Sequence, residues 1–439
     1  MSHCDLAVKG KISDQGSLMM QKKIHVFTSA ALNYIPKARV LFESVRKHHP
    51  DWVLHLALAD ELRGEIDLSK EPFDNLMTFD SLGIPEYRAW AFTHRIVELA
   101  TAIKPFALQS LLKREDCESV IYLDPDIVVF SPLDDIIAAL QQSSILLVPH
   151  QTDPETTLSA VIDNEIGSLK HGVYNLGFLG VSPTDEGMRF AHWWAQRLYY
   201  FCRADICNGL FTDQRWMDLV PAFFDEVGIV RTTRHDVATW NLTTRQLDGD
   251  FDRGFTVDGK PLGFYHFTGF DKGDHHIMAA KNAGGNKSVE MLLRWYANRI
   301  AELGKDPLCR IPWFFATFDN GEPISAEQRV VYRERVDLQR AFPDPLAAGG
   351  FLQWWKRQGV REFPELFDEK LAPAALERLR SRLSPGYRTG EDVAGMVPVT
   401  DLLLQALRNP TTARRLASRG IQVLQSEGLS GLLRRLKRY

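Results

Sequence analysis

The sequence contains little cysteine, no long apolar run and no large excess of charge of either sign. Its five cysteines among 439 residues are sparse and odd in number, which argues against a disulfide framework and is typical of free thiols in a reducing cytosol. No apolar run reaches the ~18 residues that a membrane-spanning helix needs, and residues 1–23 lack the apolar core of a signal peptide. The net charge of −4 gives no indication of nucleic-acid binding. We therefore expect a cytoplasmic protein that does not bind nucleic acid.

Short apolar segments alternate with segments of helical spacing through the first two thirds of the chain. Hydrophobic residues make up 45% and charged residues 25% of the sequence, as in ordinary soluble globular proteins. This alternation predicts an α/β protein with a mostly parallel sheet and helices on both faces. Pro105 is expected to start a second helix, since proline is tolerated in a first helical turn. The predicted strands are 24–30, 52–60, 119–124, 144–149, 174–181 and 262–268, and the predicted helices include 38–49, 93–115 and 186–201.

The character of the sequence changes at the end of this alternating part. Two stretches with helical spacing follow, "EQRVVYRERVDLQRAF" and "LAPAALERLRSRL", and prolines and glycines separate them. The sequence therefore predicts three parts, which are a flexible N-terminal tail at 1–23, an α/β domain at 24–305 and a helical region at 306–439.

The last stretch, residues 408–439, combines eight basic residues with an apolar stripe. Leu429, Leu432, Leu433 and Leu436 recur at the spacing of one helix face. A basic amphipathic helix of this kind can lie on the surface of an anionic membrane, which would make the protein peripheral to the inner face of the membrane. The alternative is that the leucines pack against the preceding helices and the basic residues form the solvated face.

Two aspartates interrupt an apolar stretch in "VIYLDPDIVVF", residues 120–130. At positions i and i+2 of one strand, Asp124 and Asp126 would point to the same face, where two carboxylates repel each other and burial is costly. A divalent cation bound by both carboxylates would remove the repulsion. The alternative is a strand that ends in a surface turn with both aspartates solvated, and the apolar run that follows argues against it. We therefore predict a metal site at this pair.

Two classes of enzyme use a pair of aspartates with this spacing. Phosphatase-like hydrolases use one aspartate as a nucleophile in a D-x-D-x-[TV] pattern, which "DPDIV" fits formally. That motif usually follows the first strand of the fold, whereas two predicted strands precede it here. Nucleotide-sugar transferases instead use the two carboxylates to hold a metal ion on the diphosphate of the donor.

The order of four motifs resembles that of the GT-A glycosyltransferases grouped in family eight, of the bacterial surface-polysaccharide type. The motifs are "VIYLDPDIVV", "VYNLGFLGV", "TDQRW" and "HFTGFDK". The resemblance implies a GT-A catalytic domain over 24–305. "HFTGFDK" matches the family pattern H-x-x-G-x-x-K, which implies that His266 is the third metal ligand and that Gly269 and Lys272 contact the diphosphate. The residue types suit this chemistry, because imidazole and carboxylates bind Mn²⁺, glycine lets backbone approach a phosphate and lysine neutralises it.

The resemblance also implies a nucleotide site at the first strand, with a UDP-sugar as the favoured donor. "IHVFTSAALNY" is similar to the first strand and nucleotide-binding turn of the family, so Thr28, Ser29 and Ala30 are expected to line the base and ribose. Asp60, at the end of the second predicted strand, is a further candidate, and the alternative is a turn or helix N-cap residue. Lys104 stands where the family commonly has an arginine near the donor phosphates, and it can act there as a point charge.

Three residues are assigned to the transferred sugar by the same resemblance. Asn175 lies in an otherwise apolar strand and must find partners there, and the family uses this residue on the donor sugar. Asp213 and Gln214 match the D-Q pair of the family, whose glutamine lies near the anomeric carbon. The weaker candidates for the acceptor side are His150, Trp216 and Trp240.

The resemblance thus implies metal-dependent transfer of a sugar from a nucleotide diphosphate to a hydroxyl of a glycan or lipid-linked acceptor, with Mn²⁺ or Mg²⁺ as the cofactor. It further implies retention of the anomeric configuration. Two routes to retention remain open, which are attack on the leaving-group face beside Gln214 or a nearby acid, and a covalent intermediate on a carboxylate. The alternatives to a transferase are the phosphatase-like hydrolase and a non-catalytic nucleotide-sugar-binding protein on the same fold.

Overall fold

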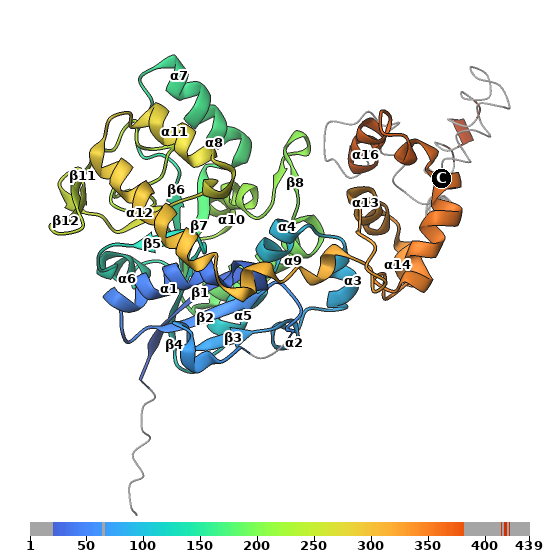
Figure 1. Ribbon diagram of the computed structural model, residues 1–439, viewed down its shortest axis with the longest axis horizontal. Coiled ribbons are helices and arrows are strands. Elements are labelled where there is room, and N and C mark those ends of the chain that lie inside the picture. The colour runs from blue at the N-terminus through green and yellow to red at the C-terminus, as the bar shows by residue number, and fades with distance from the viewer. Residues whose placement is uncertain (1–20, 64–65, 382–413, 415–416, 419–420, 422–439) are drawn as a thin grey trace, which may run out of the picture.

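A seven-stranded mixed sheet forms the centre of the part of the chain that the structure describes (Figure 1). The computed structural model describes residues 21–63 and 66–381, together with Arg414, Ala417, Ser418 and Ile421. In spatial order the strands are β10 (Val227–Ile229), β6 (Ile145–Pro149), β7 (Tyr174–Val181), β4 (Cys117–Leu123), β1 (Lys23–Ala30), β2 (Val53–Leu58) and β3 (Asn75–Met77). Strand β7 is antiparallel to its neighbours β4 and β6, and the other neighbouring strands are parallel. The predicted mixed, mostly parallel sheet is therefore confirmed.

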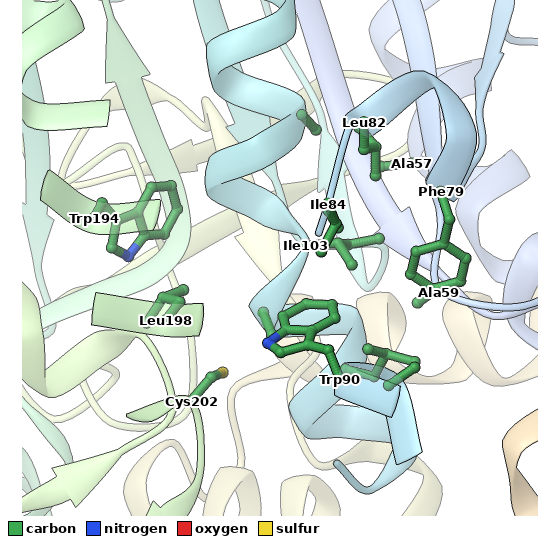
Figure 2. Packing of buried hydrophobic residues seen from close by; sticks show 14 of the residues in the cluster. Ala57, Ala59, Phe79, Leu82, Ile84, Trp90, Ile103, Trp194, Leu198 and Cys202 are labelled. Atoms are coloured by element: carbon green, nitrogen blue, oxygen red, sulfur yellow. The ribbon is translucent and has the colours of Figure 1, made fainter. Parts of the chain in front are cut away.

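Helices cover both faces of this sheet. Neighbouring residues of β1 point to opposite faces, so that Phe27 packs in a cluster with α2–α5 and α9, whereas Val26 packs in a second cluster with α1 and α6. Figure 2 shows the first cluster, in which Trp194 of α9 lies across from Trp90 of α3. The helices of this part are α1 (Ile35–His48), α2 (Phe79–Leu82), α3 (Tyr87–Phe92), α4 (Ile96–Ala102), α5 (Lys104–Leu112), α6 (Asp134–Leu140), α7 (Leu158–Ala160), α8 (Ile166–His171), α9 (Asp185–Phe201), α10 (Val220–Phe223), α11 (Asp274–Asn282) and α12 (Lys287–Leu303).

The break between α4 and α5 positions one charged side chain. As predicted, Pro105 occupies the first turn of a new helix, and Lys104 is the first residue of that helix. Because α5 packs against β4 and β1, the side chain of Lys104 is buried at the sheet rather than exposed at a helix end.

A helical region follows the α/β part, as predicted. Its helices are α13 (Ala326–Glu334), α14 (Val336–Ala341), α15 (Val360–Glu362) and α16 (Ala372–Ser381). They lie on the side of α3 and α4 in Figure 1, and Tyr332 of α13 packs edge-on against Phe92 of α3 with 5.1 Å between ring centroids. Most of the expected tail at 1–23 and of the basic stretch 408–439 lies outside the described residues.

Three small antiparallel sheets lie beside the central one. Strand β5 (Ile127–Val129) pairs with β14 (Phe264–His266), and this pair adjoins the end of β4. The others are β11 (Leu247–Asp250) with β12 (Gly254–Val257) and β13 (Lys260–Pro261), and the hairpin of β8 (Ala204–Asp205) with β9 (Leu210–Phe211). No helix in the described part of the chain has the length and apolar character of a membrane span.

The burial of His94, just after α3, predicts that the fold loses stability in mild acid. His94 is buried, its Nδ1–H donates to the carbonyl oxygen of Trp90 at 2.8 Å, and burial lowers the pKa of His94 to about 4. In the unfolded chain His94 is protonated below about pH 6.5, whereas in the folded chain it is protonated only below about pH 4. The free energy of unfolding therefore falls over this window, by up to about 3 kcal/mol from His94.

The measurement is urea unfolding of the wild type and of His94→Gln at several pH values between 7 and 4. The variant is expected to show a shallower fall in unfolding free energy with decreasing pH. His192→Gln removes an exposed histidine of α9 and should follow the wild type. Parallel profiles for His94→Gln and the wild type would contradict the prediction.

Candidate metal and donor site

The two aspartates occupy a turn between two sheets, which corrects the expectation that they lie within one strand. Strand β4 ends at Leu123, the backbone N–H of Asp124 donates to the carbonyl oxygen of Gly177 at 2.8 Å, and β5 begins after Asp126. In the β5–β14 ladder His266 is paired with Ile127. The turn carries the chain from the central sheet to β5, and β14 brings His266 beside the aspartates from more than a hundred residues away.

Asp124, Asp126 and His266 converge on one point. The Nε2 atom of His266 lies 3.1 Å from Oδ1 of Asp126 and 3.7 Å from Oδ2 of Asp124, and one ligand atom from each residue lies within 4.8 Å of the others. The side chains of the two aspartates are 26% and 18% exposed, whereas that of His266 is 3% exposed. Two carboxylates and one imidazole form a donor set that suits Mn²⁺, and the aspartates keep the group open to solvent.

Electrostatic attraction between His266 and Asp126 shifts the pKa of both groups. Burial alone would lower the pKa of His266, but the Asp126 carboxylate beside it raises that pKa to about 10. Burial would likewise raise the pKa of Asp126, and the charge of His266 brings it below the ordinary value. A divalent cation binding here has to displace the proton of His266, as is usual when a metal binds histidine.

A buried carboxylate behind His266 was not singled out from the sequence. Asp236 is 0% exposed, neither of its oxygens has a hydrogen-bond partner among the described residues, and its Oδ1 lies 3.5 Å from Nδ1 of His266. Metal-binding histidines usually donate their second ring N–H to such a carboxylate, which sets the orientation of the ring. Asp236 carries no motif in the sequence. Its neighbour Val237 forms a β-bridge with Tyr265 of β14. This contact between distant parts of the chain places Asp236 beside His266.

Gly177 of β7 makes room for the imidazole. A Cβ atom at Gly177 would lie 2.5 Å from Cε1 of His266 and 2.6 Å from Oδ1 of Asn175, which is closer than side chains tolerate. Gly177→Ala should therefore displace His266 and weaken Mn²⁺ binding about tenfold or more. Changes to residues that orient metal ligands have effects of this size.

Titration with Mn²⁺, followed by electron paramagnetic resonance of the free ion, measures this loss. Gly180→Ala is the matched control in the same strand, because a Cβ there would approach side-chain atoms of Leu140 no closer than 3.2 Å. Equal Mn²⁺ affinity in both variants would contradict the assignment of His266 as a ligand.

Lys104 lies between two carboxylates. Its Nζ is 3.0 Å from Oδ2 of Asp213 and 3.3 Å from Oδ1 of Asp124, and it also donates to the carbonyl oxygen of Leu176 at 3.3 Å. Burial acts to lower the pKa of Lys104, but the two carboxylates raise it well above the ordinary value. The hydroxyl of Tyr122 donates to the same Oδ1 of Asp124. Lys104 and Tyr122 thus occupy Oδ1 of Asp124, and Oδ2 is the oxygen nearer His266.

Asn175 and Gln214 are tied to the backbone at the start of β7. The side-chain Oδ1 of Asn175 accepts from the backbone N–H of Gly177 at 2.8 Å, and its Nδ2 donates to Nε2 of His150 at 3.2 Å. Gln214 accepts from the N–H of Leu176 and donates to the carbonyl oxygen of His171, both at 3.1 Å. The structure therefore gathers both residues around the same short segment that contacts Asp124 and Lys104.

The candidate nucleotide residues of β1 are buried in the sheet. Thr28, Ser29 and Ala30 pair with β2, and Ser29 connects to the site through a 3.4 Å contact between its Oγ and the hydroxyl of Tyr122. Asp60 is buried and accepts from the backbone N–H of Phe314 at 3.0 Å. Its observed contacts tie the segment that precedes α13 to the end of β2.

The loop after β14 carries the last two candidates. Gly269 has a φ of +70°, a left-handed conformation that glycine adopts readily, and Lys272 is exposed. Asp271, between them, pairs with Lys37 and accepts from the hydroxyl of Tyr34 at 3.4 Å. This loop therefore contacts the segment that follows β1.

The weaker acceptor-side candidates lie in two different parts of the structure, His150 and Trp240 beside His266 and Trp216 beside α9. Trp240 packs edge-on against His266 and against His150, with ring centroids 5.6 and 5.0 Å apart. Trp216 instead packs against Trp193 of α9 and belongs to the hydrophobic packing there.

Comparison with known proteins finds similarity at low levels. No family model matches the chain. YfnD of Bacillus subtilis (strain 168), described as uncharacterized, is 26% identical over 251 residues, which are 56% of this chain and 78% of YfnD. Solved structures similar to the chain include the galactosyltransferase LgtC in complex with donor and acceptor sugar analogs (TM-score 0.37, 16% identity, 64% of this chain and 94% of LgtC). Another is the glycosyltransferase GlyE of Streptococcus pneumoniae TIGR4 (TM-score 0.35, 13% identity, 68% of this chain and 67% of GlyE).

Proposed function

We propose that this chain is a metal-dependent GT-A glycosyltransferase of the family-eight type, which moves a sugar from a nucleotide diphosphate to a hydroxyl acceptor. The observation that carries the proposal is the convergence of Asp124, Asp126 and His266, with one ligand atom from each within 4.8 Å of the others. The aspartates are partly exposed, and a donor's diphosphate needs such access to share the ion.

In this proposal each group of residues has one task. Asp124, Asp126 and His266 would hold Mn²⁺ or Mg²⁺, and Asp236 would orient His266. An ion held there would supply Lewis-acid stabilisation of the negative charge on the leaving diphosphate. Gly269 and Lys272 contact that diphosphate, and the backbone of Thr28, Ser29 and Ala30 lines the nucleotide, for which UDP is favoured. The exposed position of Lys272 leaves its ammonium group available to a ligand.

The transfer step is proposed to proceed with retention beside Asn175, Asp213 and Gln214. Asp213 is the acid that we propose for either route to retention, and Lys104 forms an ion pair with its carboxylate. Burial raises the pKa of Asp213 even though Lys104 acts in the opposite direction. We propose that Asn175 contacts the donor sugar, that Gln214 stands near the anomeric carbon, and that Asp60 contributes to the nucleotide site through its backbone contacts.

The proposed setting is synthesis of a bacterial surface glycan, with residues 24–305 as the catalytic domain and 306–439 as the helical region. An acceptor carried on a lipid would suit a cytoplasmic enzyme that contacts the inner face of the membrane through 408–439. Co-sedimentation of the full chain with anionic vesicles at low salt, beside a version that ends near Asn409, tests this contact. If both remain in the supernatant, the membrane contact is wrong.

A panel of nucleotide sugars with Mn²⁺, with and without chelator and a mixture of glycan acceptors, tests the function. A glycosylated product that requires the metal ion is the expected result. Release of phosphate from simple phosphoesters without a sugar product would indicate the hydrolase instead. Binding of a nucleotide sugar without any product, from every donor and acceptor tried, would favour the non-catalytic binding protein.

A further inference from the structure

The helical segment from α7 to α8 has its polar side against the protein and its apolar side in solvent. The segment begins at Leu158 and ends at His171, with a π-helical turn at Val161–Glu165 between the two α-helices. Figure 1 shows it at the edge of the molecule, beside α11 and away from α13–α16. A surface helix normally turns its apolar side toward the core, so this segment has the opposite arrangement.

Five apolar side chains form the solvent side of the segment, which we call the α7–α8 face. They recur at intervals of three or four residues, which places them along one side of a helix. Leu158 is 77% exposed and Leu169 is 66% exposed, so these side chains project from the helix instead of lining a groove. An exposed apolar face of this kind marks an interaction surface. Its members are Leu158, Ile162, Ile166, Leu169 and Val173.

The opposite side of the segment carries polar residues that have partners within the protein. Asn164 is buried, and its Nδ2 donates to Oε1 of Glu155 at 2.6 Å. The Oε1 atom of Glu165 accepts from the backbone N–H of Glu155 at 2.7 Å, and Asp163 pairs with Lys281 of α11. Rotation of the apolar side toward the protein would separate these groups from their partners, which is costly for buried polar atoms. The outward orientation of the apolar side is therefore built into the fold.

The α7–α8 face leads into the candidate sugar site. The carbonyl oxygen of His171, at the end of α8, accepts from Nε2 of Gln214 at 3.1 Å. The carbonyl oxygen of Val173 accepts from the backbone N–H of His150 at 3.0 Å, and Asn175 lies just beyond it in β7. A surface that covers the face would therefore lie next to the residues proposed for the sugar and the acceptor.

We propose that the α7–α8 face docks on an anionic lipid bilayer, with its apolar side chains inserted at the interface. A helix with one apolar side lies in a bilayer interface in this way, whereas a single lipid chain would need a concave site. Lys170 is exposed, and the acids Asp163 and Glu165 are half-buried, which suits anionic headgroups. A bilayer can also present a lipid-linked acceptor to the adjoining site, which a second protein copy on this face would not do.

The docking itself does not depend on the reaction, and only its link to a lipid-linked acceptor rests on the proposed function. Residues 158–173 are separate in the chain from the basic stretch 408–439, so the face would be a membrane contact of its own. Loss of vesicle binding would leave the transferase proposal intact, because metal-dependent transfer to soluble acceptors tests that proposal. The two can therefore fail independently.

Co-sedimentation of the full chain with vesicles of equal parts phosphatidylcholine and phosphatidylglycerol, at subsaturating lipid, tests the docking. Leu158→Gln combined with Leu169→Gln should lower the ratio of bound to free protein by about tenfold, because two apolar side chains lose their transfer from water. The loss should persist in high salt, since apolar insertion is not screened.

A matched control changes two exposed apolar side chains elsewhere. Val97 of α4 is 68% exposed and Leu371, just before α16, is 51% exposed. Val97→Gln combined with Leu371→Gln should sediment like the wild type. Equal sedimentation of the wild type and the variant changed at Leu158 and Leu169, or a wild type that stays in the supernatant, would overturn the proposal.

Cross-linking from lipids with a photoreactive group in the acyl chain gives an answer that does not depend on a variant. Adducts that mass spectrometry maps to 158–173 are the expected result, and adducts confined to other segments would overturn the docking of this face. Analytical ultracentrifugation without vesicles tests the other occupant. A wild-type dimer that is lost on changing Leu158 and Leu169 to glutamine would assign the face to a second copy and would likewise overturn the proposal.

Discussion

Replacing Asp126 with asparagine is expected to lower kcat/KM for sugar transfer by about a thousandfold, on the scale of losing one preorganised charge contact at a reacting centre. The substitution keeps the shape of the side chain and removes its charge. His266 would then lose the partner that lies 3.1 Å from its Nε2, and the cation would lose one of two carboxylates. Mn²⁺ affinity, measured by calorimetry, should fall together with the rate.

A second substitution in the same measurements tests the contribution of Asp236 to Mn²⁺ binding. Asp236→Asn removes the charge next to Nδ1 of His266 and should weaken Mn²⁺ binding by about ten- to a hundredfold, which is less than Asp126→Asn. Asp51→Asn, at an exposed turn, should match the wild type in both measurements. Full transferase activity of Asp126→Asn, or activity that persists in excess chelator, would show that the proposed metal site is wrong.

Replacing Lys104 with methionine is expected to destabilise the fold by about 3–5 kcal/mol, the usual cost of removing one partner of a buried ion pair. Lys104 is 5% exposed and serves two carboxylates, those of Asp124 and Asp213. Without it, the buried carboxylate of Asp213 has no cation beside it and still lies near the partly exposed carboxylate of Asp124. Urea unfolding at neutral pH measures the loss, and the transfer rate should fall with it because Asp124 is a proposed metal ligand.

A double variant separates charge from shape in this prediction. Lys104→Met combined with Asp213→Asn removes the unpaired buried acid as well, and it should recover much of the lost stability. Lys113→Met changes an exposed lysine at the end of the same helix and should be nearly neutral. If the single variant unfolds like Lys113→Met, the ion pairs of Lys104 contribute nothing to stability.

Local patterns predicted most of the central elements. The apolar run at 24–30 is β1 (Lys23–Ala30), and "YNLGFLGV" is β7 (Tyr174–Val181). Pro105 marks the start of α5. Hydrophobic periodicity predicts these elements well, because a strand or helix that is buried on one face or on both shows a regular pattern among consecutive residues. The same patterns did not show that β14 leaves the central sheet to pair with β5, since pairing joins residues that are distant in the chain.

The sequence by itself was sufficient to predict a divalent-cation site at Asp124 and Asp126. Two carboxylates one residue apart indicated it, because the chemistry of a metal ion restricts its donor atoms and those donors are visible as residue types. His266 entered the prediction through the match of "HFTGFDK" to a family pattern, and its residue type alone did not single it out.

Tertiary structure alone decided which charges meet. Lys104 was predicted to serve the donor phosphates, and the fold places it between Asp124 and Asp213. Asp236 reaches His266, and Lys281 of α11 reaches Asp163, without any motif that connects them. Contacts of this kind arise where elements far apart in the chain pack together. The energy of a buried charge depends on neighbours that the local sequence does not contain.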